Sequence, residues 1–172
     1  MRIGRDRTAV CVPVPEADHA LRQWRSTYTV DGREGLGAHI TLLYPFAEPE
    51  EAAAELDRLR SHFAQHSPFD FALTEPRRFK GGVLYLAPEP AERFLELATG
   101  FQALYPERPP YGGAYADLTP HCTVADAEDD VLAVAETAVR RHLPIEAVAI
   151  EAWLVEYVRE GWSVRARLPF GR

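Results

Sequence analysis

The sequence predicts an α+β fold of two pseudo-symmetric lobes, in which antiparallel sheets form a central cleft and helices pack outside. Segments with the alternation of strands and segments with the periodicity of helices follow one another along all 172 residues. Their order is similar in the two halves, and no linker-like composition separates the halves. Since 47% of the residues are hydrophobic, we expect residues 1–172 to form a single domain with a sizeable core.

The individual elements follow from local patterns. Apolar runs and alternation predict strands at 8–14, 39–46, 69–75, 83–87, 121–125, about 145–158 and about 162–168. Apolar residues at helical spacing predict helices at about 16–28, 49–65, 90–104 and 128–142. Pro15 suits both the end of the first strand and the start of the first helix, and Pro76 to Gly82 predicts a turn. The Pro-, Gly- and Tyr-rich segment 105–120 is long for a simple connection and is typical of a lid or a cover over the core.

A His-x-Thr triplet occurs twice, as His39-Ile40-Thr41 and as His121-Cys122-Thr123, each in an apolar run typical of a strand. The two histidines are 82 positions apart (121 − 39), close to half the chain length, and a Gly-bearing loop precedes each triplet. On a strand, the His and the Thr of each triplet share one face. A fold that places the two strands side by side would therefore gather two imidazoles and two hydroxyls in one pocket.

This set of side chains suits acid–base chemistry on a phosphate ester. One imidazole can accept a proton from the attacking water while the other gives a proton to the leaving oxygen, and the ordinary pKa of His makes both forms available near neutral pH. Thr hydroxyls can donate hydrogen bonds to the non-bridging oxygens of the transition state. The scheme requires no metal and no cofactor.

Composition limits the partners. With 19 basic and 26 acidic residues, the net charge is −7, which disfavours long nucleic acids because phosphate contacts supply most of that affinity. No apolar run is long enough to cross a membrane, and the N-terminus lacks the features of a secretory signal. Cys11 and Cys122 lie in strand-like segments and are typical of buried thiols in a reducing compartment. We expect a cytoplasmic monomer that takes a small nucleotide or one RNA end.

The two triplets, in the contexts HITLLYPF and PHCTV, make the chain resemble the 2H phosphoesterase superfamily, in its 2′-5′ RNA ligase and cyclic phosphodiesterase branch. The resemblance implies a bilobal fold, catalysis by His39 and His121, and phosphate binding by Thr41 and Thr123. It also implies metal-independent action on 2′,3′-cyclic phosphates or 2′-5′ linkages. One position departs from the pattern: where ligase-like members often carry an Arg after the second triplet, this chain has Asp126.

Three further residues are candidates for substrate contacts, namely Tyr85, Tyr115 and Arg165, because a base can stack on a Tyr and an Arg can bind phosphate. Three alternatives to a cyclic phosphodiesterase remain open. The chain could bind a nucleotide or phosphate without turnover, it could join RNA by 2′-5′ ligation, or it could use His39 and His121 as metal ligands with nearby carboxylates such as Asp117.

Overall fold

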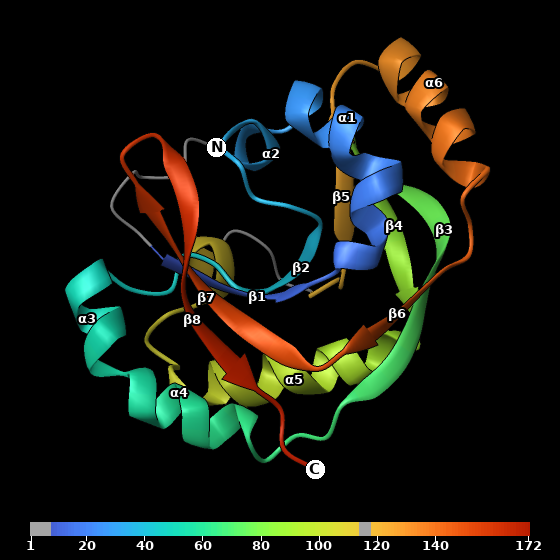
Figure 1. Ribbon diagram of the computed structural model, residues 1–172. Coiled ribbons are helices and arrows are strands. Elements are labelled where there is room, and N and C mark those ends of the chain that lie inside the picture. The colour runs from blue at the N-terminus through green and yellow to red at the C-terminus, as the bar shows by residue number, and fades with distance from the viewer. Residues whose placement is uncertain (1–7, 114–117) are drawn as a thin grey trace.

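The computed structural model describes residues 8–113 and 118–172, and the strands of these residues form one antiparallel sheet of eight (Figure 1). The strands are β1 (Thr8–Pro13), β2 (His39–Leu43), β3 (Phe69–Phe79), β4 (Val83–Glu89), β5 (Cys122–Asp126), β6 (Ile145–Ala149), β7 (Glu151–Val158) and β8 (Gly161–Pro169). The α-helices are α1 (Asp18–Tyr28), α2 (Val30–Arg33), α3 (Pro49–Ala54), α4 (Leu56–Phe63), α5 (Ala91–Leu104) and α6 (Asp129–Arg140). Short 3-10 turns cover Pro15–Ala17 and Pro110–Gly113. The predicted α+β class is confirmed.

The sheet has two lobes that meet between the two motif strands. Its strand order is β6-β3-β4-β5-β2-β1-β7-β8, so β5 and β2 are central and three strands flank each of them. The pair β2–β5 is joined through one register pair, Ile40 opposite Cys122, whereas the strands within a lobe pair over four residues or more. The two lobes therefore share one sheet and diverge from its centre.

The sheet is strongly curled. β6 forms one edge of it, whereas β7 pairs with β1 in the other lobe. Only Ile150 separates these two strands in the sequence, so the two ends of the sheet approach each other at this corner. Figure 1 shows the result as an open half-barrel.

The helices cover the outside of the sheet in a crossed manner. Helix α1 precedes β2 in the chain but contacts β5, and helix α5 precedes β5 but contacts β2. Helix α6 packs on β3, β4 and β5, while α4 packs on β8 (Figure 1). Each motif strand is thus supported by the helix that leads to the other motif strand.

The core lies between these helices and the sheet. Its largest fully buried side chains include three phenylalanines, Phe63, Phe94 and Phe101. Ile40 and Cys122, which separate the His and the Thr of each triplet, are 1% and 0% exposed. Burial of these central residues fixes the register of both motif strands, because a slip by one residue would turn the apolar side chains away from the core.

Three predicted elements differ from the structure. The strand predicted at 145–158 is two strands, β6 and β7, which pair at opposite lobes. The turn predicted from Pro76 to Gly82 is present but starts later, at residue 80, because β3 continues to Phe79. β3 pairs with β6 only up to Leu73 and with β4 beyond it, so Pro76 lies where one side of the strand has no partner that needs its N–H. The helix predicted at 49–65 is interrupted at Glu55 into α3 and α4.

Candidate active site

The pairing of β2 with β5 brings the two triplets together at the centre of the sheet. Ile40 and Cys122 are register partners on antiparallel strands. When this register is extended by one residue on each strand, His39 lies opposite Thr123 and Thr41 lies opposite His121. These four side chains share the face opposite the buried Ile40 and Cys122. Each imidazole therefore faces the hydroxyl of the other triplet.

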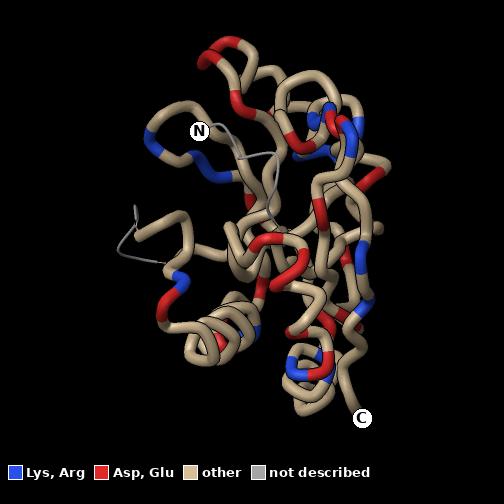
Figure 2. The backbone as a smooth tube through the Cα atoms, turned by 90° about the vertical axis from the view of Figure 1, so that its left-hand side faces the viewer, with Lys and Arg blue, Asp and Glu red and all other residues tan. Residues whose placement is uncertain are grey.

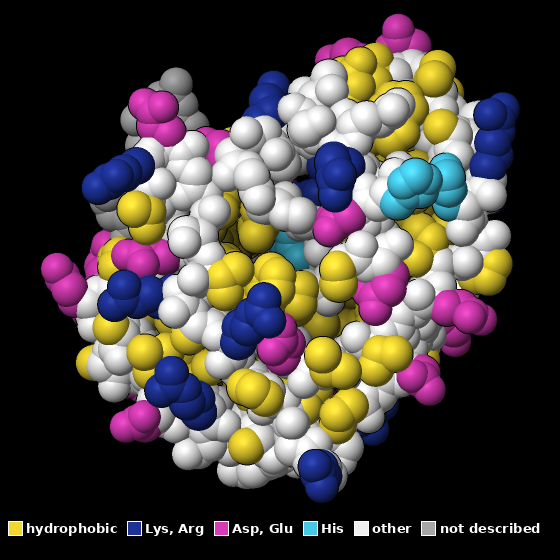
Figure 3. Space-filling model, viewed as in Figure 1, with side chains coloured by type: hydrophobic (Ala, Val, Ile, Leu, Met, Phe, Trp, Pro, Cys, Tyr) yellow, Lys and Arg dark blue, Asp and Glu magenta, His cyan; other side chains and the backbone are white. Residues whose placement is uncertain are grey.

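Figure 3 shows a hollow near the centre of this face of the molecule, with hydrophobic side chains around it and a histidine side chain visible in it. His39 is 9% exposed, and both Thr41 and Thr123 are half-buried. Water has limited access to such a site, and polar groups interact more strongly there than in bulk solvent.

Both imidazoles are fixed in the same way. The Nδ1 of His39 is 2.7 Å from the carbonyl oxygen of Gly37, and the Nδ1 of His121 is 2.7 Å from the carbonyl oxygen of Thr119. A carbonyl can only accept a hydrogen bond, so Nδ1 carries the hydrogen in both rings. The Nε2 atom of each ring is then the one that can take up or give a proton in the cleft.

His121 has an aromatic environment. The ring of Phe79 meets it edge-on with centroids 5.0 Å apart, and the ring of Tyr85 does so at 5.8 Å. Phe79 and Tyr85 also stack on each other at 4.2 Å, and Tyr85 is the cross-strand partner of Thr123. Burial lowers the pKa of His121, while its hydrogen bond to Thr119 and the Asp31 charge oppose this effect.

His39 has a charged environment instead. Its Nε2 is 3.6 Å from Oδ2 of Asp31. Burial and the Arg25 charge lower the pKa of His39, whereas the Asp31 charge and the hydrogen bond to Gly37 raise it; the net direction is downward. Burial alone would raise the pKa of Asp31, but the charges of His39 and Arg25 outweigh it and hold the pKa of that carboxyl below its usual value. Asp31 is therefore ionised at neutral pH.

A buried arginine connects these groups. Arg25, on α1, is 2% exposed. Its Nη1 donates a hydrogen bond of 2.9 Å to the carbonyl of Thr123, its Nη2 donates one of 3.0 Å to the carbonyl of Leu36, and Nη2 is 3.3 Å from Oδ1 of Asp31. One side chain thus ties the second triplet to the loop that leads into the first triplet.

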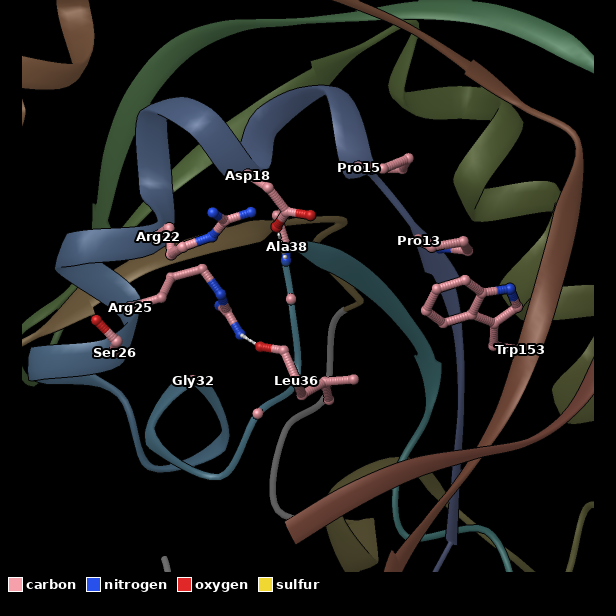
Figure 4. Close-up of a pocket in the computed structure, with 12 residues that line it drawn as sticks. Pro13, Pro15, Asp18, Arg22, Arg25, Ser26, Gly32, Leu36, Ala38 and Trp153 are labelled. Atoms are coloured by element: carbon pink, nitrogen blue, oxygen red, sulfur yellow. Dashed lines mark hydrogen bonds between the residues drawn. The ribbon is translucent and has the colours of Figure 1, made fainter.

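A pocket of about 350 Å³ adjoins the loop before His39 (Figure 4). Arg22 and Arg25 extend from α1 along one side of it, Leu36 lies on that loop, and Trp153 projects from β7 on the other side. The dashed line in Figure 4 is the hydrogen bond from Arg25 to Leu36. Arg25 is already engaged with its protein partners, so the exposed Arg22 on one side and the indole of Trp153 on the other are the groups that suit an anionic ligand with an aromatic ring.

Two of the three predicted substrate contacts, Tyr85 and Arg165, lie on different strands, β4 and β8. Tyr85 is beside His121, as described, and is 5% exposed. Arg165 lies on β8, where its guanidinium is 3.8 Å from the carboxylate of Glu156. Tyr115 lies outside the described residues, as does the carboxylate Asp117 that was considered as a metal ligand. Asp126, at the position where an Arg is common in ligase-like relatives, is exposed.

Sequence reasoning missed Arg25 and Asp31. A signal was present for Arg25, because it follows Leu21 by four residues and so falls on the buried face of the helix, where a charged residue needs a partner. Asp31 occurs in the Gly-bearing loop before the first triplet, but no pattern in the sequence shows that this loop folds back onto His39.

Within 8–113 and 118–172, no three His, Cys, Asp or Glu side chains are grouped so that they could hold a metal ion. Among the helices of the same residues, none has both the length and the apolar character that crossing a bilayer requires.

Comparison with known proteins identifies the family. The model of the 2′-5′ RNA ligase superfamily matches residues 13–161. The fold is similar to that of Escherichia coli LigT complexed with 3′-AMP, which has a TM-score of 0.65 and 16% identity over 98% of this chain and 100% of that one. It is also similar to E. coli LigT complexed with NADP+ (TM-score 0.65, 15% identity, 97% and 98% coverage) and to TT0787 of Thermus thermophilus (TM-score 0.61, 22% identity, 95% and 97% coverage). No curated protein sequence matched the chain. With the family model covering most of its length, this chain belongs to the 2′-5′ RNA ligase superfamily of 2H phosphoesterases.

Proposed function

We propose that the protein is a metal-independent phosphodiesterase that opens the 2′,3′-cyclic phosphate of a small nucleotide or of an RNA end. The observation that carries this proposal is the matched pair of imidazoles, His39 and His121, each with Nδ1 held by a carbonyl and Nε2 left for proton transfer. General acid–base catalysis at phosphorus needs one proton acceptor and one proton donor on opposite sides of the reacting atom. Two such groups on adjacent strands meet this need.

The reaction adds one water molecule. One Nε2 takes a proton from the water as its oxygen forms a bond to phosphorus, and the other Nε2 gives a proton to the ribose oxygen as the bond from that oxygen to phosphorus breaks. Thr41 and Thr123 donate hydrogen bonds to the non-bridging oxygens, where negative charge increases. The product is a ribose 2′- or 3′-monophosphate.

A small nucleotide fits the surroundings of the site. E. coli LigT is described in complexes with 3′-AMP and with NADP+, and the pocket of about 350 Å³ along the loop that leads to His39 offers Arg22 and an indole for the part of such a ligand away from the phosphate. Tyr85 and Arg165 remain candidate contacts. In Figure 2, basic and acidic residues are interspersed along the described chain, and with a net charge of −7 this favours a short ligand over a long nucleic acid. We also propose that the protein acts as a cytoplasmic monomer.

Binding without turnover is the second candidate function. The observation in its favour is the exposed Asp126, which replaces the Arg that is common after the second triplet in ligase-like relatives. The same position argues against 2′-5′ ligation, since a carboxylate repels a phosphate that approaches it.

The test is hydrolysis of 2′,3′-cyclic nucleotides in the presence of EDTA by the wild-type protein and by His39→Asn and His121→Asn. The Asn amide can still donate to the carbonyl that holds Nδ1, but it cannot carry a proton at Nε2. We expect activity in EDTA and a loss of about 10²–10⁴-fold in each variant. His142→Ala is the control, because His142 is exposed on the outside of the fold, and it should keep full activity.

The outcomes separate the candidates. Loss of wild-type activity in EDTA, or full activity in both Asn variants, would refute the proposed mechanism. Tight binding of a 2′- or 3′-monophosphate with no product from any cyclic nucleotide would favour the binding function.

A further inference from the structure

The two imidazoles have the same kind of partner at Nδ1, a backbone carbonyl, but their surroundings differ at Nε2. Oδ2 of Asp31 is 3.6 Å from Nε2 of His39. Among the described residues, no carboxylate lies within ion-pairing distance of His121, which instead contacts the rings of Phe79 and Tyr85. Three strands flank each of β5 and β2 at the centre of the sheet, but Asp31 makes the surroundings of the two imidazoles unequal at the reacting atoms.

We propose that Asp31 is a positioning residue that assigns the proton roles, so that His39 gives the proton to the leaving oxygen and His121 takes the proton from water. This inference rests on the proposed function. It concerns the state in which the pair of imidazoles holds one Nε2 proton, which is the state that acid–base catalysis needs. Asp31 determines which ring holds that proton.

The partners of the two ring nitrogens support this assignment. Nδ1 of His39 donates to the Gly37 carbonyl at 2.7 Å, and Nε2 is at ion-pairing distance, 3.6 Å, from the Asp31 carboxylate. Only the imidazolium carries a hydrogen on both nitrogens and the positive charge that such an ion pair requires. A neutral His39 would leave the lone pair of Nε2 directed at a negative charge. For His121 the only such acceptor among the described residues is the Thr119 carbonyl, so its neutral form is fully satisfied.

Asp31 is held in place from several directions. Its Oδ1 is 3.3 Å from Nη2 of Arg25, and hydrogen bonds with the Thr29 side chain and the Gly32 backbone further lower its pKa. The short helix α2 that carries it is fixed at its C-terminal end by Glu34, whose carbonyl accepts from the backbone N–H of Trp162 at 2.9 Å. A carboxylate restrained in this way can act on His39 without reorganising during the reaction.

The other groups around His39 act against protonation. The charged groups that act on it are Arg25 on α1, Asp31 on α2 and His121 before β5, and the thiols of Cys11 and Cys122 belong to the strands β1 and β5 that pair with β2. Burial, the Arg25 charge and the His121 charge lower the pKa of His39. Burial raises the pKa of both thiols to about 12, which leaves them neutral. Asp31 is therefore the one negative charge among these neighbours, and its removal leaves the opposing influences uncompensated.

The test begins with a titration of the free wild-type protein, which requires no substrate. The Cε1–H signals of His39 and His121 are assigned with the two Asn variants and followed by NMR against pH. We expect His39 to titrate at the higher pKa of the two. Asp31→Asn should lower the pKa of His39 and shift that of His121 less, while Asp31→Glu should restore the order. Asp57→Asn, which removes a fully exposed carboxylate on α4, should change neither.

The second measurement is the pH dependence of kcat/KM for a 2′,3′-cyclic nucleotide. The proposal expects Asp31→Asn to move the alkaline limb to lower pH, to move the acid limb less and to reduce kcat by up to about 10²-fold at pH 8. Asp31→Glu should recover much of this loss. A residue that acts only on stability would reduce activity without moving the alkaline limb of the pH profile relative to the acid limb.

Three results would overturn the proposal. They are a wild-type titration in which His121 has the higher pKa, a pKa of His39 that does not fall in Asp31→Asn, and a shift of the acid limb in place of the alkaline limb. The first result needs no change at Asp31, only the wild-type protein and the two Asn variants that assign its signals, so it decides the matter even if Asp31→Asn does not fold. Absence of turnover with the expected titration order would refute the proposed function and leave the pairing of Asp31 with His39 intact.

Discussion

Replacement of Arg25 by Met tests whether one buried guanidinium holds the two halves of the site together. The side chain is 2% exposed, donates to the carbonyls of Thr123 and Leu36 at 2.9 and 3.0 Å, and pairs with Asp31 at 3.3 Å. Met fills a similar volume with an unbranched chain, so the main loss is electrostatic. Removal of one partner of a buried ion pair costs about 3–5 kcal/mol, because the remaining charge loses its compensation.

Urea unfolding measures this cost through the midpoint, provided that the slope with denaturant stays constant. Arg22→Met is the matched control: Arg22 lies one turn earlier on α1 and is exposed, and we expect a change within about 0.5 kcal/mol. The double variant Arg25→Met/Asp31→Asn removes the uncompensated carboxylate as well. Its free energy of unfolding should therefore fall by at least about 1 kcal/mol less than the sum of the two single losses, as is usual for residues in one ion-pair network.

Two results would refute this reasoning. One is a loss below about 1 kcal/mol for Arg25→Met, which would show that the buried charge is not held by these partners. The other is strict additivity in the double variant, which would show that Arg25 and Asp31 do not interact energetically.

Two further predictions follow from the pKa directions. Burial raises the pKa of the Cys11 and Cys122 thiols to about 12, so neither should react with a thiol reagent at pH 8 until urea unfolds the protein, and a fast reaction in the native state would contradict this. The pKa values of His39 and His121 lie below the ordinary 6.5 in the folded chain. The unfolded chain then binds more protons as the pH falls below about 6.5, and stability should decrease by up to about 1.4 kcal/mol per pH unit for each histidine. Urea midpoints at pH 7.5, 6.5 and 5.5 check this, with the double Asn variant as the comparison; equal pH dependence in both proteins would contradict it.

The sequence predicted the α+β class and the order of most elements because these depend on local periodicity. Strand alternation also assigns the faces of His39 and Thr41, since Ile40 between them must be buried. The strand boundaries that were predicted wrongly depend on pairing with strands that are distant in the sequence. Pro76 can remain in β3 only because β6 has already ended beside it, and Ile150 divides an apolar run whose two parts pair in different lobes.

The charged part of the site could not be predicted for the same reason. Arg25 acts on Thr123, 98 residues away in the sequence, and no local pattern encodes that distance. Asp31 approaches His39 because α2 is fixed against the β7–β8 turn through Glu34. The charged part of the site therefore depends on two tertiary contacts, that of Arg25 with Thr123 and that of Glu34 with Trp162, rather than on residue spacing.

The crossed helices have a consequence for how the protein folds and unfolds. Because α1 covers β5 and α5 covers β2, neither half of the chain carries the cover of its own motif strand. A half released by cutting the β3–β4 turn would expose the apolar face of its motif strand to water, which disfavours a compact monomer. The two halves are therefore obliged to fold as one cooperative unit, and local unfolding of either motif strand removes both triplets together. A single ancestral half could have hidden its strand only beneath the helix of a second copy, as in a domain-swapped dimer.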